Sequence, residues 1–366
     1  MRPPCRKSGC ERLKEHIKRC GFFRNLRILE RTLAERKGDR KVEEKERKGR
    51  LENIDWSDAG ILIALIAMAI FFSVSTKAFF SANNFSNIAR QISIVGICAV
   101  GMTMVILTGG IDLSIGSLIG LAAVAGAKMM SGGTPVFVTV PAVLALGVLV
   151  GAVNATCING LRIPPMITTL GMMISIRGAV YLISGGMPVY GLPESFKVLG
   201  QNNIGIIPIS MIIMVAVFVI GYIILNRTVF GRRIYGIGGN PETARLSGVN
   251  VKKEIYKIYC FAGFMGALAG LILMSRVNSG QPNAGDGYEM DIITAVVLGG
   301  VSVSGGEGKL SKVIIGVIFM GILANGMMMM NISDYWQRVV KGIVLLAAVA
   351  IDIRSKDKKA KAVVKG

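Results

Sequence analysis

Long apolar runs separated by short polar links occupy the chain from Trp56 to about residue 354. Most of these runs are close to the roughly 20 residues that an α-helix needs to cross a bilayer. About ten spans can be drawn, at residues 59–79, 88–108, 113–131, 137–158, 164–184, 206–225, 256–276, 290–304, 312–331 and 336–353. The pattern therefore predicts an all-α, polytopic integral membrane protein.

The spans also carry features of helices that pack against protein. Gly263, Ala267 and Gly270 place small residues at three- and four-residue intervals, which favours the close approach of two helices. The eighth span, 290–304, is short and rich in glycine. We therefore expect a broken or re-entrant segment there, surrounded by protein rather than lipid.

Both ends of the chain are polar. Residues 1–55 form a charged tail, and its segment 31–50 is almost free of apolar residues, so we expect it to be disordered or a loose helix. It is not a signal peptide, because no apolar region or cleavage site follows its basic residues. The tail is either a true extension or an over-long start. Residues 355–366 form a second, basic tail.

The basic residues predict the orientation of the spans. The polar link at 226–258 holds seven Lys and Arg residues, and the C-terminal tail holds several more. Lys and Arg are concentrated in the cytoplasmic links of membrane proteins. Both termini and the 226–258 link are therefore predicted to face the cytoplasm.

Composition supports the membrane class. The sequence is 52% hydrophobic, with a mean hydropathy of +0.57, yet its formal net charge is +20. These values conflict in a soluble protein, whereas a membrane protein with basic tails and inner links reconciles them. The charge then favours anionic lipid as a partner. No basic surface interleaved with aromatic residues supports nucleic-acid binding.

A short helix is predicted inside the 226–258 link. Asn240 suits the N-cap, Pro241 the first helical position, and Glu242 the positive end of the helix dipole. Gly248 can adopt the left-handed conformation that ends a helix. Such a helix at the membrane surface is a contact point for a partner protein. An ordinary positive-inside link is an equally good interpretation of the pattern.

Three polar clusters lie inside or beside the spans, where polar groups are costly. The first, TGGIDLSIG at 108–116, is either a helix break that meets a polar solute or a cap for the next helix. The second lies within the fifth span. The third, at 278–294, fits an outer vestibule, a docking rim for a soluble partner or a solvated link. The candidate solute-path residues of the three clusters are Asp112, Ser114, Thr168, Thr169, Arg177, Asp291 and Thr294.

The sequence contains no recognised catalytic or metal-binding motif. Its only histidine is His16, in the tail, so the spans have no imidazole for acid–base or metal chemistry. Cys10, His16 and Cys20 match no zinc spacing. The run GGEGKLSK at 305–312 lacks the first Gly and the Ser or Thr of a Walker A motif. We expect no catalytic residue, no bound metal or cofactor and no ATPase site.

Four stretches carry a specific resemblance to a known family. They are LTGGIDLSIGSLIGLAA (107–123), LRIPPMITTLGMMISIRGAVYLISGG (161–186), TVFGRRIYGIGGNPETARLSGVNV (228–251) and ITAVVLGGVSVSGGEGKL (293–310). Residues from about 56 to 354 resemble the permease subunit of a bacterial ABC sugar importer, of the ribose, galactose and xylose branch. The tail at 1–55 departs from that family, whose members usually start a few residues before the first span.

The resemblance implies a multi-pass subunit of the bacterial inner membrane that is not itself an enzyme. It implies an ABC ATPase subunit, which uses ATP and Mg, and a periplasmic or lipoprotein sugar-binding protein. A second permease copy is implied too, as a homodimer or a related heterodimer. The family's coupling helix, which inserts into the ATPase, corresponds to Asn240, Pro241, Glu242, Thr243, Ala244, Arg245, Leu246, Ser247 and Gly248, with Ala244, Leu246 and Gly248 as contact-like positions.

The expected solute is a monosaccharide, either a ribose-like pentose or a hexose. Within the importer interpretation, the alternatives are a nucleoside, a signalling furanose or a branched-chain amino acid. An ion-coupled secondary transporter is a weaker alternative, because only Asp112 and Asp291 offer titratable groups deep in the spans. A membrane-embedded enzyme is disfavoured because no cluster of nucleophile, acid and metal ligands is visible.

Overall fold

The computed structural model describes residues 56–365, with side chains described from 60 to 354. The expectations for the tail at 1–55, including Cys10, His16 and Cys20, lie outside the described residues. Residues 61–366 form one compact unit. The elements in chain order are α3 (Trp56–Ser75), α4 (Ala82–Leu107), α5 (Ile115–Ser131), α6 (Val136–Gly160), α7 (Pro165–Ser184), α8 (Glu194–Gln201), β1 (Asn203–Ile204), β2 (Ile207–Pro208), α9 (Ile209–Arg227), α10 (Val229–Gly239), α11 (Pro241–Leu246), α12 (Val251–Val277), α13 (Tyr288–Leu298), α14 (Leu310–Met329) and α15 (Asp334–Lys365).

The all-α class and the polytopic character are confirmed. Within the part of the chain that the structure describes, six helices are long and apolar enough to cross a membrane, namely α4, α6, α7, α9, α12 and α14. The described parts of α3 and α5 are shorter apolar helices. The only sheet among residues 56–365 is the two-residue antiparallel hairpin of β1 and β2. The count of about ten spans and the cytoplasmic position of the termini stay predictions.

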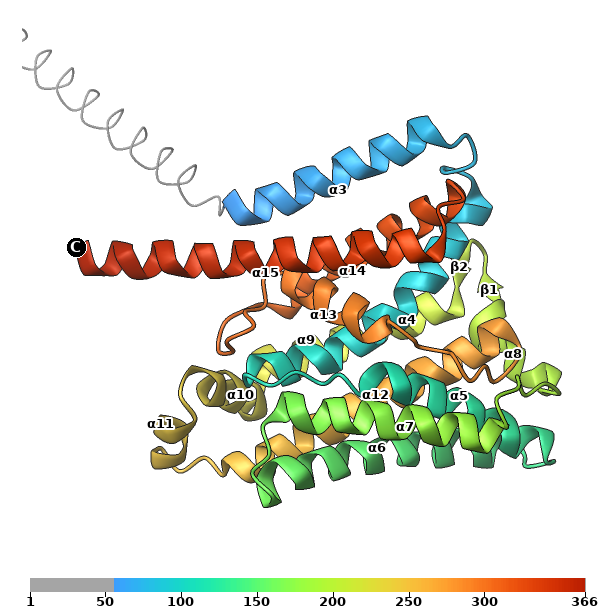
Figure 1. The fold of residues 1–366 in the computed structure, drawn as a ribbon, viewed down its shortest axis with the longest axis horizontal. Helices are drawn as coiled ribbons and strands as arrows, with labels where there is room; N and C mark the ends of the chain where they lie inside the picture. Colours follow the sequence, from blue (N-terminus) through green and yellow to red (C-terminus); the bar gives the residue numbers. More distant parts are fainter. Residues whose placement is uncertain (1–55, 366) are drawn as a thin grey trace, which may run out of the picture. The chain divides into compact units, whose positions relative to one another are not determined.

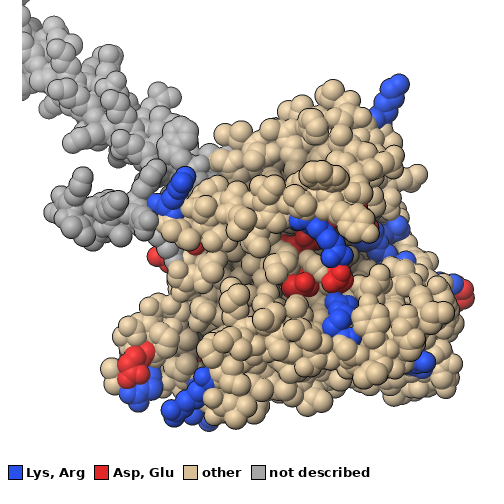
Figure 2. Space-filling view, viewed as in Figure 1, with Lys and Arg blue, Asp and Glu red and all other residues tan. Residues whose placement is uncertain are grey.

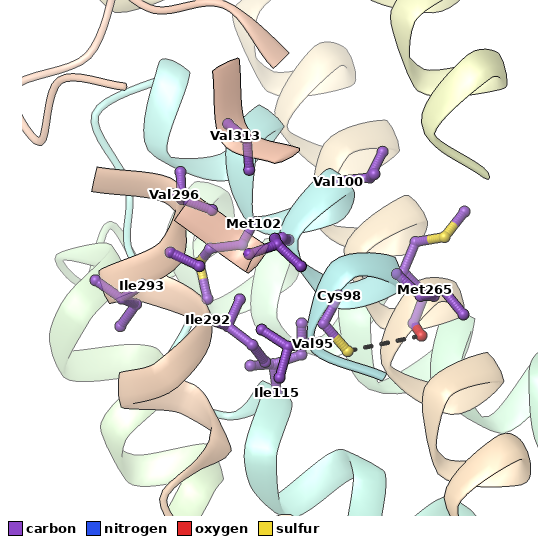
Figure 3. Packing of buried hydrophobic residues seen from close by; sticks show 14 of the residues in the cluster. Val95, Cys98, Val100, Met102, Ile115, Met265, Ile292, Ile293, Val296 and Val313 are labelled. Atoms are coloured by element: carbon purple, nitrogen blue, oxygen red, sulfur yellow. Dashed lines mark hydrogen bonds between the residues drawn. The ribbon is translucent and has the colours of Figure 1, made fainter. Parts of the chain in front are cut away.

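Helices α4 and α12 form the centre of the bundle. Both are largely buried, whereas α6, α7 and α9 expose much of their apolar surface, as helices in contact with lipid do. Figure 3 shows Cys98 and Met102 of α4 close to Met265 of α12 and Ile292 of α13. The Cys98 thiol lies 3.9 Å from the carbonyl oxygen of Met265. One continuous core therefore joins α4, α12 and α13.

The predicted close packing of small residues is confirmed where α6 crosses α12. A Cβ atom added to Gly263 would lie 2.1 Å from the carbonyl oxygen of Gly147, and one added to Gly151 would lie 2.1 Å from that of Tyr259. Real Cβ atoms do not approach oxygen so closely. The two helices therefore meet backbone to backbone, and any larger residue would separate them.

The eighth apolar segment is broken, as its glycine content predicted. Helix α13 has 11 residues, a length of roughly 16 Å at 1.5 Å per residue, which is about half of a 30 Å hydrocarbon core. An irregular stretch at 299–309 follows it, and Val301 and Ser302 in that stretch are buried. A second irregular stretch, 108–114, separates α4 from α5. Irregular backbone inside the hydrocarbon core of a membrane requires protein around it.

The two ends of the bundle differ. In Figure 1, α10, α11 and the C-terminal end of α15 lie at one end, while α8 and the β1–β2 hairpin lie at the other. We call these the α11 end and the α8 end. The predicted cytoplasmic elements, the 226–258 link and the C-terminus, thus share one end of the bundle.

Candidate functional site

The short helix predicted in the 226–258 link is present as α11, with the predicted caps. The Oδ1 atom of Asn240 accepts a hydrogen bond from the backbone N–H of Thr243 at 2.9 Å, and Pro241 is the first helical residue. After the helix ends at Leu246, Gly248 has a φ of +83°, a conformation that favours glycine. The role of this helix in coupling stays a prediction.

Helix α11 has an inner and an outer face. Ala244 is buried, whereas Leu246, an apolar residue within the polar link, is 75% exposed. Arg245 forms an exposed ion pair with Glu242, with 2.6 Å between Nη2 and Oε1. The hydrogen bonds from the Arg245 guanidinium hold the pKa of the Glu242 carboxyl below its usual range. The outer face therefore offers one apolar side chain next to a charged pair.

A partly buried ion pair joins α10, which leads into α11, to α12. The Glu254 carboxylate, on α12, is 3% exposed and accepts hydrogen bonds from Arg233 of α10 at 2.8 Å and from Lys257 at 3.2 Å. Asn250 caps the start of α12 through the backbone N–H of Lys253 at 3.1 Å. Arg233 and Lys257 are 43% and 58% exposed, so solvent screens the charges of the two cations, and the pair contributes modestly to holding α10 against α12.

Helix α10 also touches the end of α4 and the irregular stretch 299–309. A Cβ atom on Gly238 would lie 1.8 Å from the carbonyl oxygen of Leu107 and 2.4 Å from the backbone nitrogen of Gly306. That nitrogen donates a hydrogen bond to the same carbonyl at 2.9 Å. The Tyr235 hydroxyl donates to the carbonyl oxygen of Gly308 at 2.9 Å. Movement of α10 would therefore act directly on the residues next to 108–114 and on 299–309.

The first polar cluster is a hydrogen-bonded turn. Oδ1 of Asp112 accepts hydrogen bonds from the backbone N–H of Ser114 at 2.9 Å and from its hydroxyl at 2.6 Å. Asn154 of α6 donates to the Ser114 hydroxyl oxygen at 2.9 Å. Asp112 and Ser114 are both buried, and the Tyr259 hydroxyl beside Gly110 has no hydrogen-bond partner among the described residues. Asp112 therefore closes a turn just before α5, whose N-cap is Ser114, with the polar groups of α6 and α12 close by.

The second cluster connects the other two. The Thr169 hydroxyl donates to the carbonyl oxygen of Ile111 at 2.9 Å, which ties α7 to the first cluster. Nη1 of Arg177, two turns further along α7, donates to the carbonyl oxygens of Pro282 at 3.2 Å and Ala284 at 2.9 Å. The hydroxyl of Thr168 is buried without a partner among the described residues. Arg177 thus anchors the 278–287 loop.

The third cluster lies at the start of α13, facing α15. Asp291 pairs with Lys341 of α15 at 2.6 Å, and the exposed Asp286 pairs with Arg338 at 2.8 Å. Thr294 is directed elsewhere, since its hydroxyl donates to the carbonyl oxygen of Met290 within α13. Sequence reasoning did not include the α15 partners among the candidate path residues. Their helical spacing along α15 could have indicated them, because residues three and four apart share a face.

Sequence comparison identifies the group of proteins to which this architecture belongs. The family described as "Branched-chain amino acid transport system / permease component" matches residues 84–349. The chain belongs to this permease family. Its match covers all three polar clusters and α11. The resemblance to a permease is therefore confirmed, and the long apolar helices agree with a membrane location.

Several named relatives are sugar permeases. The permease is 42% identical to the ribose import permease protein RbsC of Escherichia coli strain K12 over 295 residues, which cover 80% of this chain and 92% of that protein. It is 41% identical to RbsC of Bacillus subtilis strain 168 over 295 residues, with the same coverage. It is 40% identical to the L-arabinose transport system permease protein AraH of E. coli K12 over 297 residues, 81% of this chain and 90% of that protein. No solved structure matches the chain.

Among the described residues, no group of three or more His, Cys, Asp or Glu side chains could hold a metal ion. Cys98, Cys157 and Cys260 are free cysteines. The described clusters contain ion pairs, hydroxyls and amides. Such groups can bind a polar solute and hold helices together.

Proposed function

We propose that the permease is the membrane-spanning subunit of an ATP-driven ABC importer that carries a monosaccharide, a ribose-like pentose or a hexose. The observation that carries this proposal is identity of about 40% to ribose and arabinose permeases over 80% of the chain. A periplasmic or lipoprotein binding protein delivers the sugar, and a separate ATPase subunit hydrolyses ATP with Mg. A second permease copy completes the pathway, as a homodimer or a related heterodimer, in the bacterial inner membrane.

The proposed coupling starts at α11, which faces the cytoplasm. Leu246 and its neighbours on α11 contact the ATPase, and closure of the two ATPase subunits displaces the helix. The Arg233–Glu254 pair transmits this displacement to α12, and the contact of Gly238 with Leu107 transmits it to α4. The pathway then opens alternately to the two sides, as two states of one equilibrium that ATP binding shifts.

The family description names one alternative solute, a branched-chain amino acid. The sugar names of the relatives at 40–42% identity favour the monosaccharide. An ion-coupled secondary transporter is a weaker alternative. The described Asp112 and Asp291 are the acids it would need, and Asp112 already accepts two hydrogen bonds from Ser114.

The test is uptake of labelled ribose, arabinose and xylose by proteoliposomes that contain the permease with its ATPase. Each assay is run with and without the binding protein and ATP. Uptake that needs both components is the expected result. Uptake driven by an ion gradient without ATP would contradict the proposal, and ATP-dependent uptake of leucine in place of sugar would favour the amino-acid alternative.

A further inference from the structure

A pocket of about 600 Å³ separates the start of α13 from α15. Its volume lies within the 300–1,000 Å³ typical of small-molecule sites. Figure 2 shows acidic and basic side chains gathered in a hollow of the face in view. The pocket is lined by Asp286, Gly287, Tyr288, Glu289, Met290, Asp291, Asp334, Gln337, Arg338, Lys341, Gly342 and Leu345.

One face of α15 supplies half of this lining. Its members recur at three- and four-residue steps from Asp334 through Gln337 and Lys341 to Leu345, so they form a single stripe along the helix. Gly342 lies in the same stripe, and a Cβ atom there would meet nothing within 4 Å. The stripe therefore leaves open space on the α13 side.

The positive charges of the pocket are already paired. Lys341 pairs with Asp291 at 2.6 Å, and Arg338 pairs with Asp286 at 2.8 Å. A ligand with a carboxylate group would have to break one of these pairs to find a cationic partner. The pocket therefore disfavours an anionic group.

Hydrogen-bond acceptors remain in excess. Glu289 and Asp291 are 8% and 6% exposed, and Oε2 of Glu289, which lies against Gly116 of α5, and Oδ1 of Asp291 have no hydrogen-bond partner among the described residues. Buried polar atoms without partners are costly and uncommon. The last torsion of a carboxylate side chain rotates easily, so each group can present an oxygen to a molecule in the pocket. A neutral molecule with several hydroxyl groups would supply the missing donors.

We propose that this pocket is a binding site for the transported sugar, in which Glu289 and Asp291 accept hydrogen bonds from its hydroxyl groups. Gln337 and Lys341 line the facing side. This inference rests on the proposed function and deepens it, because it moves the candidate solute path from the buried Asp112 turn to the space between α13 and α15. Arg177 contributes indirectly, by anchoring the loop that leads into α13.

Thiol labelling tests occupancy of the pocket without any transport step. Gly342→Cys places a thiol in the open space, and Glu194→Cys places a control thiol on the exposed start of α8. Both variants are treated with a membrane-impermeant maleimide in proteoliposomes, and labelling is measured above that of the parent chain. We expect millimolar ribose, arabinose or xylose to slow labelling at position 342 and leave position 194 unchanged. Equal labelling with and without sugar, or protection by leucine alone, would overturn the proposal.

Uptake provides the second test. Gly342→Leu fills the pocket without displacing a neighbour, and Gly171→Leu makes the same change at a helical glycine of α7 that also has nothing within 4 Å. We expect the Gly342→Leu complex to lose sugar uptake while its ATPase activity persists, and the Gly171→Leu complex to keep both. Normal uptake by Gly342→Leu would contradict the pocket assignment. Absence of sugar uptake by the unmodified complex would instead contradict the proposed function.

Discussion

Gly238→Ala tests the contact through which α10 reaches the membrane helices. The added Cβ atom would lie 1.8 Å from the carbonyl oxygen of Leu107, whereas ordinary contacts begin at 3.4 Å. Helix α10 must therefore move by roughly 1.6 Å, enough to disturb the 2.9 Å hydrogen bond from Gly306 to the same oxygen. Overpacking of this kind costs about 1–3 kcal/mol.

The control is Gly236→Ala, on the same helix, where a Cβ atom meets nothing within 4 Å. Alanine is favoured over glycine in a helix by about 1 kcal/mol, and this gain is common to both variants. Their difference therefore isolates the strain at Gly238. The strain disfavours the conformation described here relative to any state in which α10 has moved away from Leu107.

A bias of about 1–3 kcal/mol changes the ratio of two states by roughly 5- to 150-fold, since 1.4 kcal/mol is a factor of ten. We expect the uptake rate of the Gly238→Ala complex to be roughly 5- to 150-fold lower than that of the Gly236→Ala complex. ATP hydrolysis should be less affected. The assay is ATP-dependent uptake of labelled sugar in proteoliposomes, with hydrolysis measured in the same samples. Equal uptake by the two variants would refute the role assigned to this contact.

Four other substitutions test the remaining parts of the coupling and anchoring scheme. Leu246→Asp and Gly248→Pro should each prevent docking of the ATPase and sugar uptake while leaving membrane insertion intact. Pull-down of the ATPase measures docking, and normal uptake by either variant would contradict the coupling assignment. Glu254→Gln removes the buried charge that two partly exposed cations share, so we expect thermal stability in detergent to fall by an amount equivalent to about 1 kcal/mol, because solvent screens both cations; an unchanged melting temperature would show that the pair contributes little. Arg177→Met should expose the 278–287 loop to added protease, because the variant loses both hydrogen bonds to that loop, and protection equal to that of the unmodified chain would argue against the anchoring role.

Local sequence signals predicted the local structure well. The caps of α11 at Asn240 and Gly248 could be predicted because each depends on the intrinsic preference of one residue. The break in the eighth apolar segment could be predicted for the same reason, because it depends on the intrinsic preference of its glycines. The apolar runs likewise predicted the long helices, since burial in lipid requires them.

Contacts between distant segments could not be predicted from the sequence. Glu254 looks like an ordinary first-turn acid of α12, and its burial against Arg233 becomes visible only when α10 folds back. Asp291 was a candidate for the path, but its partner Lys341 lies 50 residues further along the chain. Such pairs depend on how helices cross, which the spacing of apolar residues does not specify.

The backbone contact between α6 and α12 limits how the bundle can deform. Helices that touch through side chains can slide, because rotamers readjust while contact is kept. Gly147 and Gly263 have no side chains to readjust, so α6 and α12 either stay locked or separate completely. A force applied to α12 should therefore move α6 and α12 together as a rigid pair. Any rearrangement of the bundle then has to occur where this pair contacts other helices.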